Sequence, residues 1–198
     1  PAPVVSPDKK WEAYIKDNNL YLSPVRDEKD KGKQKEEIAL TMDGTTNLRY
    51  DAWSIIWSPD SRKLATVKVR DVTERRIPLI ESSPFSQKQP ILQWRDYAKP
   101  GDVLPVYLPV LFDVEARKQV TLDVAPYENQ FYLHLTGWRE DSRAFTFEFN
   151  QRGHQRYVIG EVNATDGSIR HLVDEQTKTF IYYYNNYRHD LNDGKELL

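Results

Sequence analysis

Alternating apolar and polar residues recur along this chain in short runs, and this pattern predicts β-strands separated by turns. The clearest run is 144–149, where Phe145, Phe147 and Phe149 alternate with other positions, so one face of this strand is expected to be buried. Similar runs on both sides complete a unit of four strands. These strands are expected at 133–135, 144–149, 155–162 and 168–173.

A short turn phrase occurs four times, each time between two predicted strands. The phrases occupy residues 6–10, 58–62, 139–143 and 191–195, with an aspartate in the third position of each. Aspartate can bond the backbone two residues on, and the proline of the first two phrases presets φ, so each phrase predicts a tight hairpin turn. A supersecondary unit that returns at roughly 40–50 residues is typical of a propeller or an array.

The strand and turn pattern predicts one domain with an all-β fold. We expect a partial β-propeller of four-stranded antiparallel blades, with two complete blades and two partial ones. The blade units are expected at about residues 4–41, 52–123, 131–173 and 179–198. A long insertion at 70–104 contains four prolines and is expected to be an irregular excursion from the second unit.

Some strands are expected from weaker patterns. The first unit shows only three strands, with a charged hairpin tip at 26–37. In the second unit a strand is expected at 52–57, and a later hairpin pairs 106–114 with 119–122. The fourth unit is expected to open with a strand at 180–184.

A closed propeller typically needs about four to eight blades. We therefore expect this chain to be a segment of a larger propeller. As an isolated piece it is expected to expose apolar faces between blades and to self-associate as a homo-oligomer.

Composition and charge exclude several classes of partner. The formal net charge is −2, which gives no basis for binding nucleic acid or an anionic membrane surface. The sequence has no cysteine, so disulfides and thiolate metal sites are excluded. No stretch approaches about 18 apolar residues, so no membrane span is expected. A cysteine-free chain fits the cytosol and the bacterial periplasm equally well.

Known catalytic and cofactor motifs do not occur in the sequence. There is no Gly-x-Ser-x-Gly elbow, no His-Glu-x-x-His, no phosphate-binding glycine loop and no dinucleotide fingerprint. We therefore expect no catalytic residue, no cofactor and no metal in this chain. His134 and His171 fall within predicted strands and are interpreted as structural.

Three residues are candidates for contacting a substrate. Arg152 and His154 occupy a predicted hairpin turn with Gly153 between them. Arginine suits two-point binding of a carboxylate, and histidine could donate to a substrate carbonyl. Tyr184 ends a tyrosine run, from which at least one ring must face away from the core. The alternatives are a solvated turn around a glycine with positive φ and ordinary packing of the tyrosines.

Several short runs resemble one peptidase family. The run WSPDSRKLA at 57–65 looks like a blade signature of the N-terminal propeller of dipeptidyl peptidase IV-like serine peptidases, in the prolyl oligopeptidase superfamily. IPLIE at 77–81 and YAKPGD at 97–102 resemble segments of the same propeller in the same order, and DNNLY at 17–21 resembles a common sequence of its first blade.

The resemblance implies an eight-bladed propeller that caps an α/β-hydrolase domain of the same polypeptide. That C-terminal domain, which this sequence lacks, would hold the catalytic serine, aspartate and histidine. The propeller of such enzymes restricts access and holds the free N-terminus of a peptide substrate through two glutamates on a short helical insertion. That insertion should precede the strand at Trp53, where this sequence offers only Asp51.

The resulting hypothesis is a non-catalytic propeller portion of a dipeptidyl peptidase IV-like serine peptidase, which gates access and contributes to peptide binding. The expected location is periplasmic or secreted in a bacterium. One alternative is a stand-alone propeller that acts as a protein-interaction scaffold. Another is part of a pseudo-peptidase whose hydrolase domain lacks its nucleophile.

Overall fold

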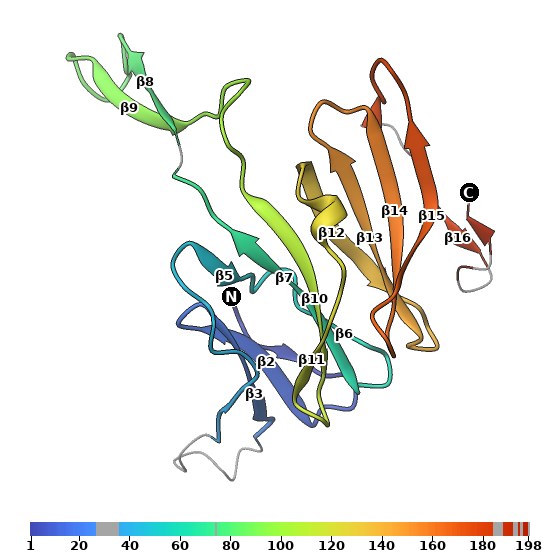
Figure 1. The fold of residues 1–198 in the computed structure, drawn as a ribbon. Coiled ribbons are helices and arrows are strands. Elements are labelled where there is room, and N and C mark those ends of the chain that lie inside the picture. The colour runs from blue at the N-terminus through green and yellow to red at the C-terminus, as the bar shows by residue number, and fades with distance from the viewer. Residues whose placement is uncertain (27–35, 74, 184–187, 192–193, 195, 198) are drawn as a thin grey trace.

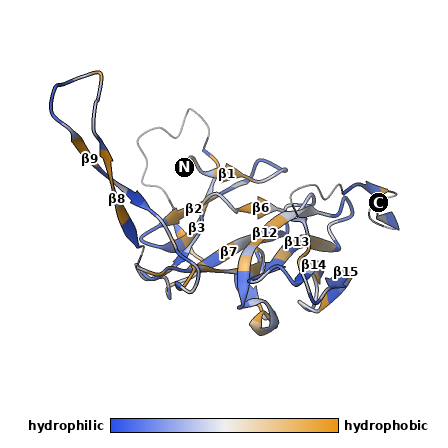
Figure 2. Cartoon of the chain, turned by 90° about the horizontal axis from the view of Figure 1, so that it is seen from above, coloured by the Kyte–Doolittle hydropathy of each residue, from blue (hydrophilic) through white to orange (hydrophobic). Residues whose placement is uncertain are grey.

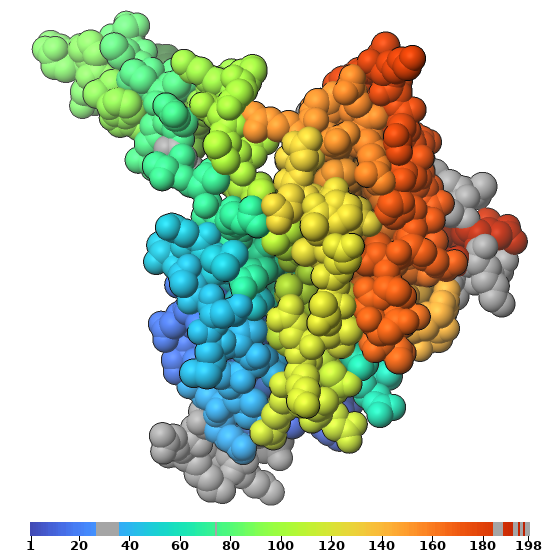
Figure 3. Space-filling model, in the orientation of Figure 1, coloured from blue at the N-terminus to red at the C-terminus, as the bar shows by residue number. Residues whose placement is uncertain are grey.

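The computed structural model describes residues 1–26, 36–73, 75–183, 188–191, 194 and 196–197. Within these residues, antiparallel sheets stand side by side in an open arc (Figure 1). In the space-filling view the sheets follow one another in chain order across the molecule (Figure 3). The expected all-β fold, a partial β-propeller, is confirmed.

The first sheet contains one strand more than the sequence analysis predicted. Its strands, in spatial order, are β1 (Val4–Val5), β2 (Trp11–Lys16), β3 (Asn19–Pro24) and β4 (Ile38–Ala39). The additional strand is β1, which pairs with β2 across the first turn phrase. A strand of two residues is too short to show alternation in the sequence. Most of the predicted charged tip, 27–35, lies outside the described residues.

The second sheet is interrupted where a continuous strand was predicted. Its strands are β5 (Leu48–Tyr50), β6 (Ile56–Trp57), β7 (Lys63–Arg70), β10 (Val106–Asp113) and β11 (Lys118–Val120). The predicted strand at 52–57 is therefore wrong for its first four residues, because 51–54 form a turn between β5 and β6. The later hairpin of β10 and β11 is confirmed.

The third sheet is the most regular. Its strands lie in chain order and are β12 (Gln130–Trp138), β13 (Ala144–Gln151), β14 (Arg156–Asn163) and β15 (Ile169–Gln176). A 3-10 helix, Ala125–Tyr127, leads into β12. As the alternation predicts, Phe145, Phe147 and Phe149 are all buried on one face.

Two apolar cores lie between the three sheets, and strand β7 contributes to both. Leu64 packs into the core shared with the first sheet, whereas the next residue, Ala65, packs into the core shared with the third. In the same way, Phe112 and Leu111 of β10 enter opposite cores. Successive side chains of a strand point to opposite faces, so a sheet between two neighbours is buried on both sides.

The insertion at 70–104 forms an ordered arm and not the irregular excursion that was predicted. Strands β8 (Arg76–Glu81) and β9 (Ile91–Asp96) pair over their whole length and project beyond the sheets (Figure 1). Pro78 lies within β8. A two-stranded hairpin has only edge strands, and edge strands accept proline. The prolines of this segment therefore did not exclude a strand.

The turn phrases align along one end of the sheets and connect neighbouring sheets. The Asp8 amide donates to Ser61 Oγ at 3.0 Å, and the Asp60 amide donates to Ser142 Oγ at 3.0 Å. The fourth residue of each phrase has positive φ, at 60°, 63°, 63° and 74° for Lys9, Ser61, Ser142 and Gly194. The predicted tight turns are thus confirmed for the first three phrases, and the fourth lies partly outside the described residues.

The fourth unit begins differently from the prediction. The described part of the expected strand, 180–183, is not a strand, and the unit instead contains β16 (Asp190–Leu191) and β17 (Glu196–Leu197). Phe180 and Tyr183 turn their rings towards His154 instead of joining a sheet. Tertiary packing of the rings therefore overrides the strand propensity of this aromatic run.

Candidate functional site

The turn between β13 and β14 presents the two sequence-predicted candidates Arg152 and His154. The His154 amide donates to the Gln151 carbonyl at 2.8 Å, and the Arg152 amide donates to the Asn129 carbonyl at 3.1 Å. Gly153 has φ of +94°, which is why glycine is favoured between them. His154 itself has φ of +57°, an uncommon value for a residue with a side chain. Backbone bonds therefore fix the direction of both side chains.

Aromatic rings surround the imidazole of His154. The ring of Tyr183 stacks on it with centroids 4.7 Å apart, and the rings of Phe131 and Phe180 meet it edge-on at 4.6 and 5.1 Å. Asn150 Oδ1 lies 3.1 Å from His154 Nδ1. We call Phe131, Asn150, His154, Phe180 and Tyr183 the His154 cluster.

Burial sets the charge state of the His154 cluster. It lowers the pKa of the His154 imidazole below its usual 6.5, so the ring is neutral at neutral pH. Asn150 is 1% exposed, and its Nδ2 has no hydrogen-bond partner among the described residues. The cluster also anchors the chain leading to the fourth unit, because the Ile181 amide donates to the His154 carbonyl at 2.8 Å.

The structure therefore describes two of the three sequence-predicted candidates. Arg152 and His154 share one turn, and the faces of the His154 ring are occupied by packing. Tyr184 lies outside the described residues, although its neighbour Tyr183 belongs to the His154 cluster. A substrate-contacting role for Arg152, His154 and Tyr184 stays a prediction.

A second site, absent from the sequence analysis, is a groove between the second and third sheets. It encloses about 300 Å³ and is lined by Asp51, Trp53, Ser54, Ile56, Val67, Tyr107, Leu133, His134 and Leu135. We call it the inner groove. One wall is the turn between β5 and β6, and the opposite wall is strand β12.

Trp53 is displayed at the edge of the inner groove on a turn that hydrogen bonds hold in place. Its side chain is 83% exposed. Ser54 Oγ donates to the Asp51 carbonyl at 3.0 Å and accepts the Val67 amide at 3.0 Å. Thr66 Oγ1 donates to the same Asp51 carbonyl at 2.9 Å. Hydrogen bonds of these two side-chain hydroxyls thus hold residues 51–54 in a turn, and Trp53 points outward from it.

The opposite wall of the inner groove is an edge strand. β12 pairs with β13 only, and no backbone hydrogen bond joins its other edge to a strand among the residues that the structure describes. His134 of this strand lies at the surface, with Nε2 3.3 Å from a carboxylate oxygen of Glu148. The groove therefore combines apolar walls, unpaired backbone groups and nearby carboxylates.

The inner groove was not predicted, because the alternation at residues 52–57 indicates a single strand. The signal that was available is the spacing of Asp51 and Ser54, two turn-forming residues three positions apart that flank Ala52 and Trp53. An exposed tryptophan cannot be distinguished from a buried one by residue type alone.

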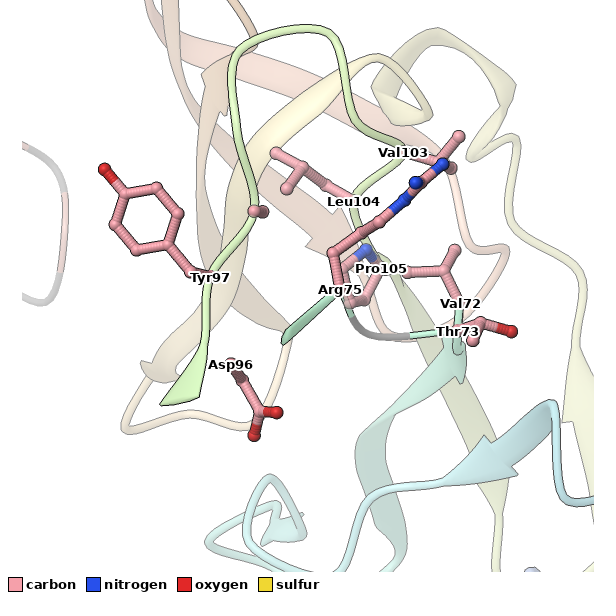
Figure 4. A pocket seen from close by; sticks show the side chains of 9 residues that line it. Val72, Thr73, Arg75, Asp96, Tyr97, Val103, Leu104 and Pro105 are labelled. Carbon is pink, nitrogen blue, oxygen red and sulfur yellow. The ribbon is translucent and has the colours of Figure 1, made fainter. Parts of the chain in front are cut away.

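A third hollow lies at the base of the arm (Figure 4). It encloses about 200 Å³ between the start of β8, the end of β9 and the chain that returns to β10. Its walls are mainly apolar, from Val72, Val103 and Leu104, and the side chain of Arg75 extends across it towards Val103. The Tyr97 amide donates to the Arg75 carbonyl at 2.8 Å and so closes the base of the arm.

Two features are absent from the described part of the chain. Within it, no group of three or more histidine, aspartate or glutamate side chains is arranged to hold a metal ion. None of the helices in this part is long and apolar enough to cross a membrane.

Comparison with known proteins identifies similar sequences and structures. The family model for the dipeptidyl peptidase IV N-terminal region matches residues 2–197. The crystal structure of Porphyromonas gingivalis dipeptidyl peptidase 4 superposes with a TM-score of 0.63 at 17% identity, over 90% of this chain and 26% of that one. A putative dipeptidyl aminopeptidase IV from Bacteroides ovatus gives a TM-score of 0.63 at 15% identity, over 91% and 25%. The chain thus spans about a quarter of the length of these proteins.

Proposed function

The chain belongs to the dipeptidyl peptidase IV N-terminal region family, and on this basis we propose that it is the non-catalytic propeller portion of a dipeptidyl peptidase IV-like serine peptidase. In this role it limits access to an active centre and contributes to binding of the peptide substrate. The family match over almost the whole chain is the observation that carries the proposal. The side-by-side sheets, an arrangement that suits one wall of a channel, support it.

The partner in this proposal is an α/β-hydrolase domain of the same polypeptide. That domain supplies the nucleophile, since the present sequence contains no Gly-x-Ser-x-Gly elbow. The solved relatives are about four times as long as this chain, which leaves room for such a domain. We place the protein in the periplasm of a bacterium or outside the cell, and cell fractionation with an antibody tests this location.

Serine-directed labelling of the native protein tests the proposed function. An antibody against the exposed arm, 76–96, would capture the native polypeptide from its source cells, and a fluorophosphonate probe would then be added. We expect one labelled polypeptide much larger than this chain, whereas the 198-residue chain alone takes up no label and hydrolyses no dipeptidyl chromogenic substrate.

Two other results would overturn the proposal. A large polypeptide that contains this chain but stays unlabelled would indicate a pseudo-peptidase. A captured protein no larger than the chain would indicate a stand-alone scaffold. A prepared serine peptidase of known activity, labelled in the same lysate, controls for quenching of the probe.

We also infer that the arm mediates association with a second copy of the chain. The register pairs Pro78 with Trp94 and Ile80 with Leu92, so these four side chains share one face of the hairpin. All four are exposed, and Figure 2 shows hydrophobic (orange) segments in both strands of the arm. A second copy presents the same apolar face, which suits a two-fold interface.

Sedimentation measurements test the arm as an interface. The change Trp94→Glu places a charge on the apolar face and is expected to weaken self-association at least about tenfold. Trp53→Glu is the matched control, because Trp53 is an exposed tryptophan away from the arm. A chain that remains monomeric at high concentration, or equal association of both variants, would contradict the inference.

A further inference from the structure

We propose that the inner groove binds an extended peptide segment, which adds as a strand to the free edge of β12 and packs against Trp53. This inference rests on the proposed function, because it names the part of the propeller that receives the peptide. It concerns the body of the peptide and not its N-terminal amine.

The anchor is Trp53, whose position is fixed before any ligand arrives. A tryptophan that is 83% exposed leaves a large apolar area in water. The hydroxyls of Ser54 and Thr66 hold its turn at both ends, through the Asp51 carbonyl and the Val67 amide. Binding therefore costs little ordering of the backbone, and tryptophan is among the residues most enriched at binding hot spots.

The edge is the side of β12 that pairs with no strand among the described residues, and residues of β12 line the groove together with Trp53. Unpaired amides and carbonyls of an edge strand are a template for another strand, and proteins use this for peptide binding. The pairing with β13 shifts register between Gln130 and Tyr132 and again between Leu135 and Gly137. The regular stretch between these shifts, Tyr132 to Leu135, includes the β12 residues that line the groove.

The walls of the groove define the chemistry of the peptide. Ile56 and Leu135, which are half-buried, supply apolar surface for an aliphatic or aromatic side chain. Asp51 lines the groove and shares the guanidinium of Arg49 with Asp71, at 3.6 and 2.6 Å, and Glu148 lies behind His134, so carboxylates outnumber guanidinium groups here. Carboxylates at this position favour lysine or arginine next to the apolar side chain and disfavour acidic segments. The occupant is thus an extended, non-acidic segment that alternates apolar and basic residues.

A peptide with blocked ends provides the test. The probe is an acetylated and amidated ten-residue peptide of alternating valine and lysine that carries fluorescein, and binding to the 198-residue chain is followed by fluorescence anisotropy. We expect saturable binding that weakens at least about tenfold with Trp53→Ala. Phe85→Ala is the control and leaves binding unchanged, because Phe85 is a fully exposed aromatic residue between β8 and β9, outside the groove and outside the apolar face of the arm.

Two N-methylated isomers of the probe separate strand addition from attraction between charges. One carries methyl groups on the amides of its odd residues and the other on those of its even residues. A strand uses only alternate amides to pair with one edge, so one isomer is expected to lose at least about tenfold in affinity while the other binds like the parent. This comparison uses the unmodified protein and so does not depend on the folding of a variant.

Three results would overturn the inference: no saturable binding up to about 1 mM peptide, equal binding of both isomers, or binding by Trp53→Ala within twofold of the unmodified chain. None of these readouts requires a hydrolase domain or a nucleophile. The inference can therefore fail while serine-directed labelling still supports the proposed function, and the two failures are distinguishable.

Discussion

Single hydroxyl groups connect neighbouring sheets at the turn phrases. Ser61 and Ser142 each place Oγ where the amide of the preceding phrase can donate to it, and their positive φ creates that direction. The sequence analysis recognised these phrases as turns from their aspartates. It could not show that the serines act between sheets, because a contact across 53 or 82 residues depends on how the sheets stack.

Removing one of these hydroxyls should have a measurable cost. The change Ser142→Ala leaves the Asp60 amide without its acceptor, and we expect the free energy of unfolding to fall by about 1 kcal/mol. Urea denaturation measures this value. Ser168→Ala is the control, since the Ser168 hydroxyl bonds only locally to Asp166 at an exposed turn. Equal losses from the two changes would contradict a role between sheets.

At the scale of elements, the sequence was most informative where each strand has one apolar face towards a core. The alternating phenylalanines of β13 are the clearest case, and its neighbours followed from similar runs. The arm could not be predicted in this way. Strands β8 and β9 bury neither face, so no core requires apolar residues at every second position. The turn at 51–54 was missed because its tryptophan has the strand propensity of a buried one.

Pairing of β14 with β15 includes an ion pair whose strength depends on pH. Arg156 donates to both carboxylate oxygens of Asp174, at 2.9 and 2.8 Å, and these bonds hold the pKa of Asp174 well below its usual 3.8. A depressed pKa in the folded state stabilises the protein above the unfolded value. That stability is lost as pH falls through the folded pKa.

The expected outcome is a stability profile that declines on acidification below about pH 4. Asp174→Asn should be less stable than the unmodified chain at pH 7 and should show a shallower decline in acid. Chemical denaturation at a series of pH values checks both. Asp166→Asn controls for loss of a carboxylate that bonds only within its own turn. If the stability of Asp174→Asn falls in acid as steeply as that of the unmodified chain, the role assigned to Asp174 is contradicted.

Across the whole molecule, the boundary between the third sheet and the fourth unit differs in chemistry from the other two. The boundaries between the first and second sheets and between the second and third sheets are apolar cores. At the boundary with the fourth unit, the buried Arg139, which is 5% exposed, forms ion pairs with Glu161 at 2.7 Å and with Asp190 at 2.9 Å. Gly194 occupies the phrase position that serine holds at 61 and 142. A Cβ at this glycine would lie 1.9 Å from Arg139 Nη1, so the arginine excludes a serine there.

A double-mutant cycle tests this dependence. Gly194→Ser and Arg139→Ser are each expected to lower the free energy of unfolding by about 1–3 kcal/mol, through a clash and through the loss of buried ion pairs. Together they place serine at the first position of the third phrase and at the fourth position of the fourth phrase, as Ser58 and Ser142 already stand in the second and third phrases. The double variant should therefore lose at least about 1 kcal/mol less than the sum of the single losses. Additive losses, measured by urea denaturation, would show that the two positions are independent.

The arrangement of β7, with Leu64 towards one core and Ala65 towards the other, constrains how such a molecule can diversify. Extra sequence inserted within that strand would shift its side chains and misalign two interfaces at once. Length can be added without this penalty only beyond the strand's end, and the arm emerges there, between Arg70 and Val106. Insertions in this family should therefore accumulate at the ends of the blades, whereas the central strands of each blade keep an almost constant length.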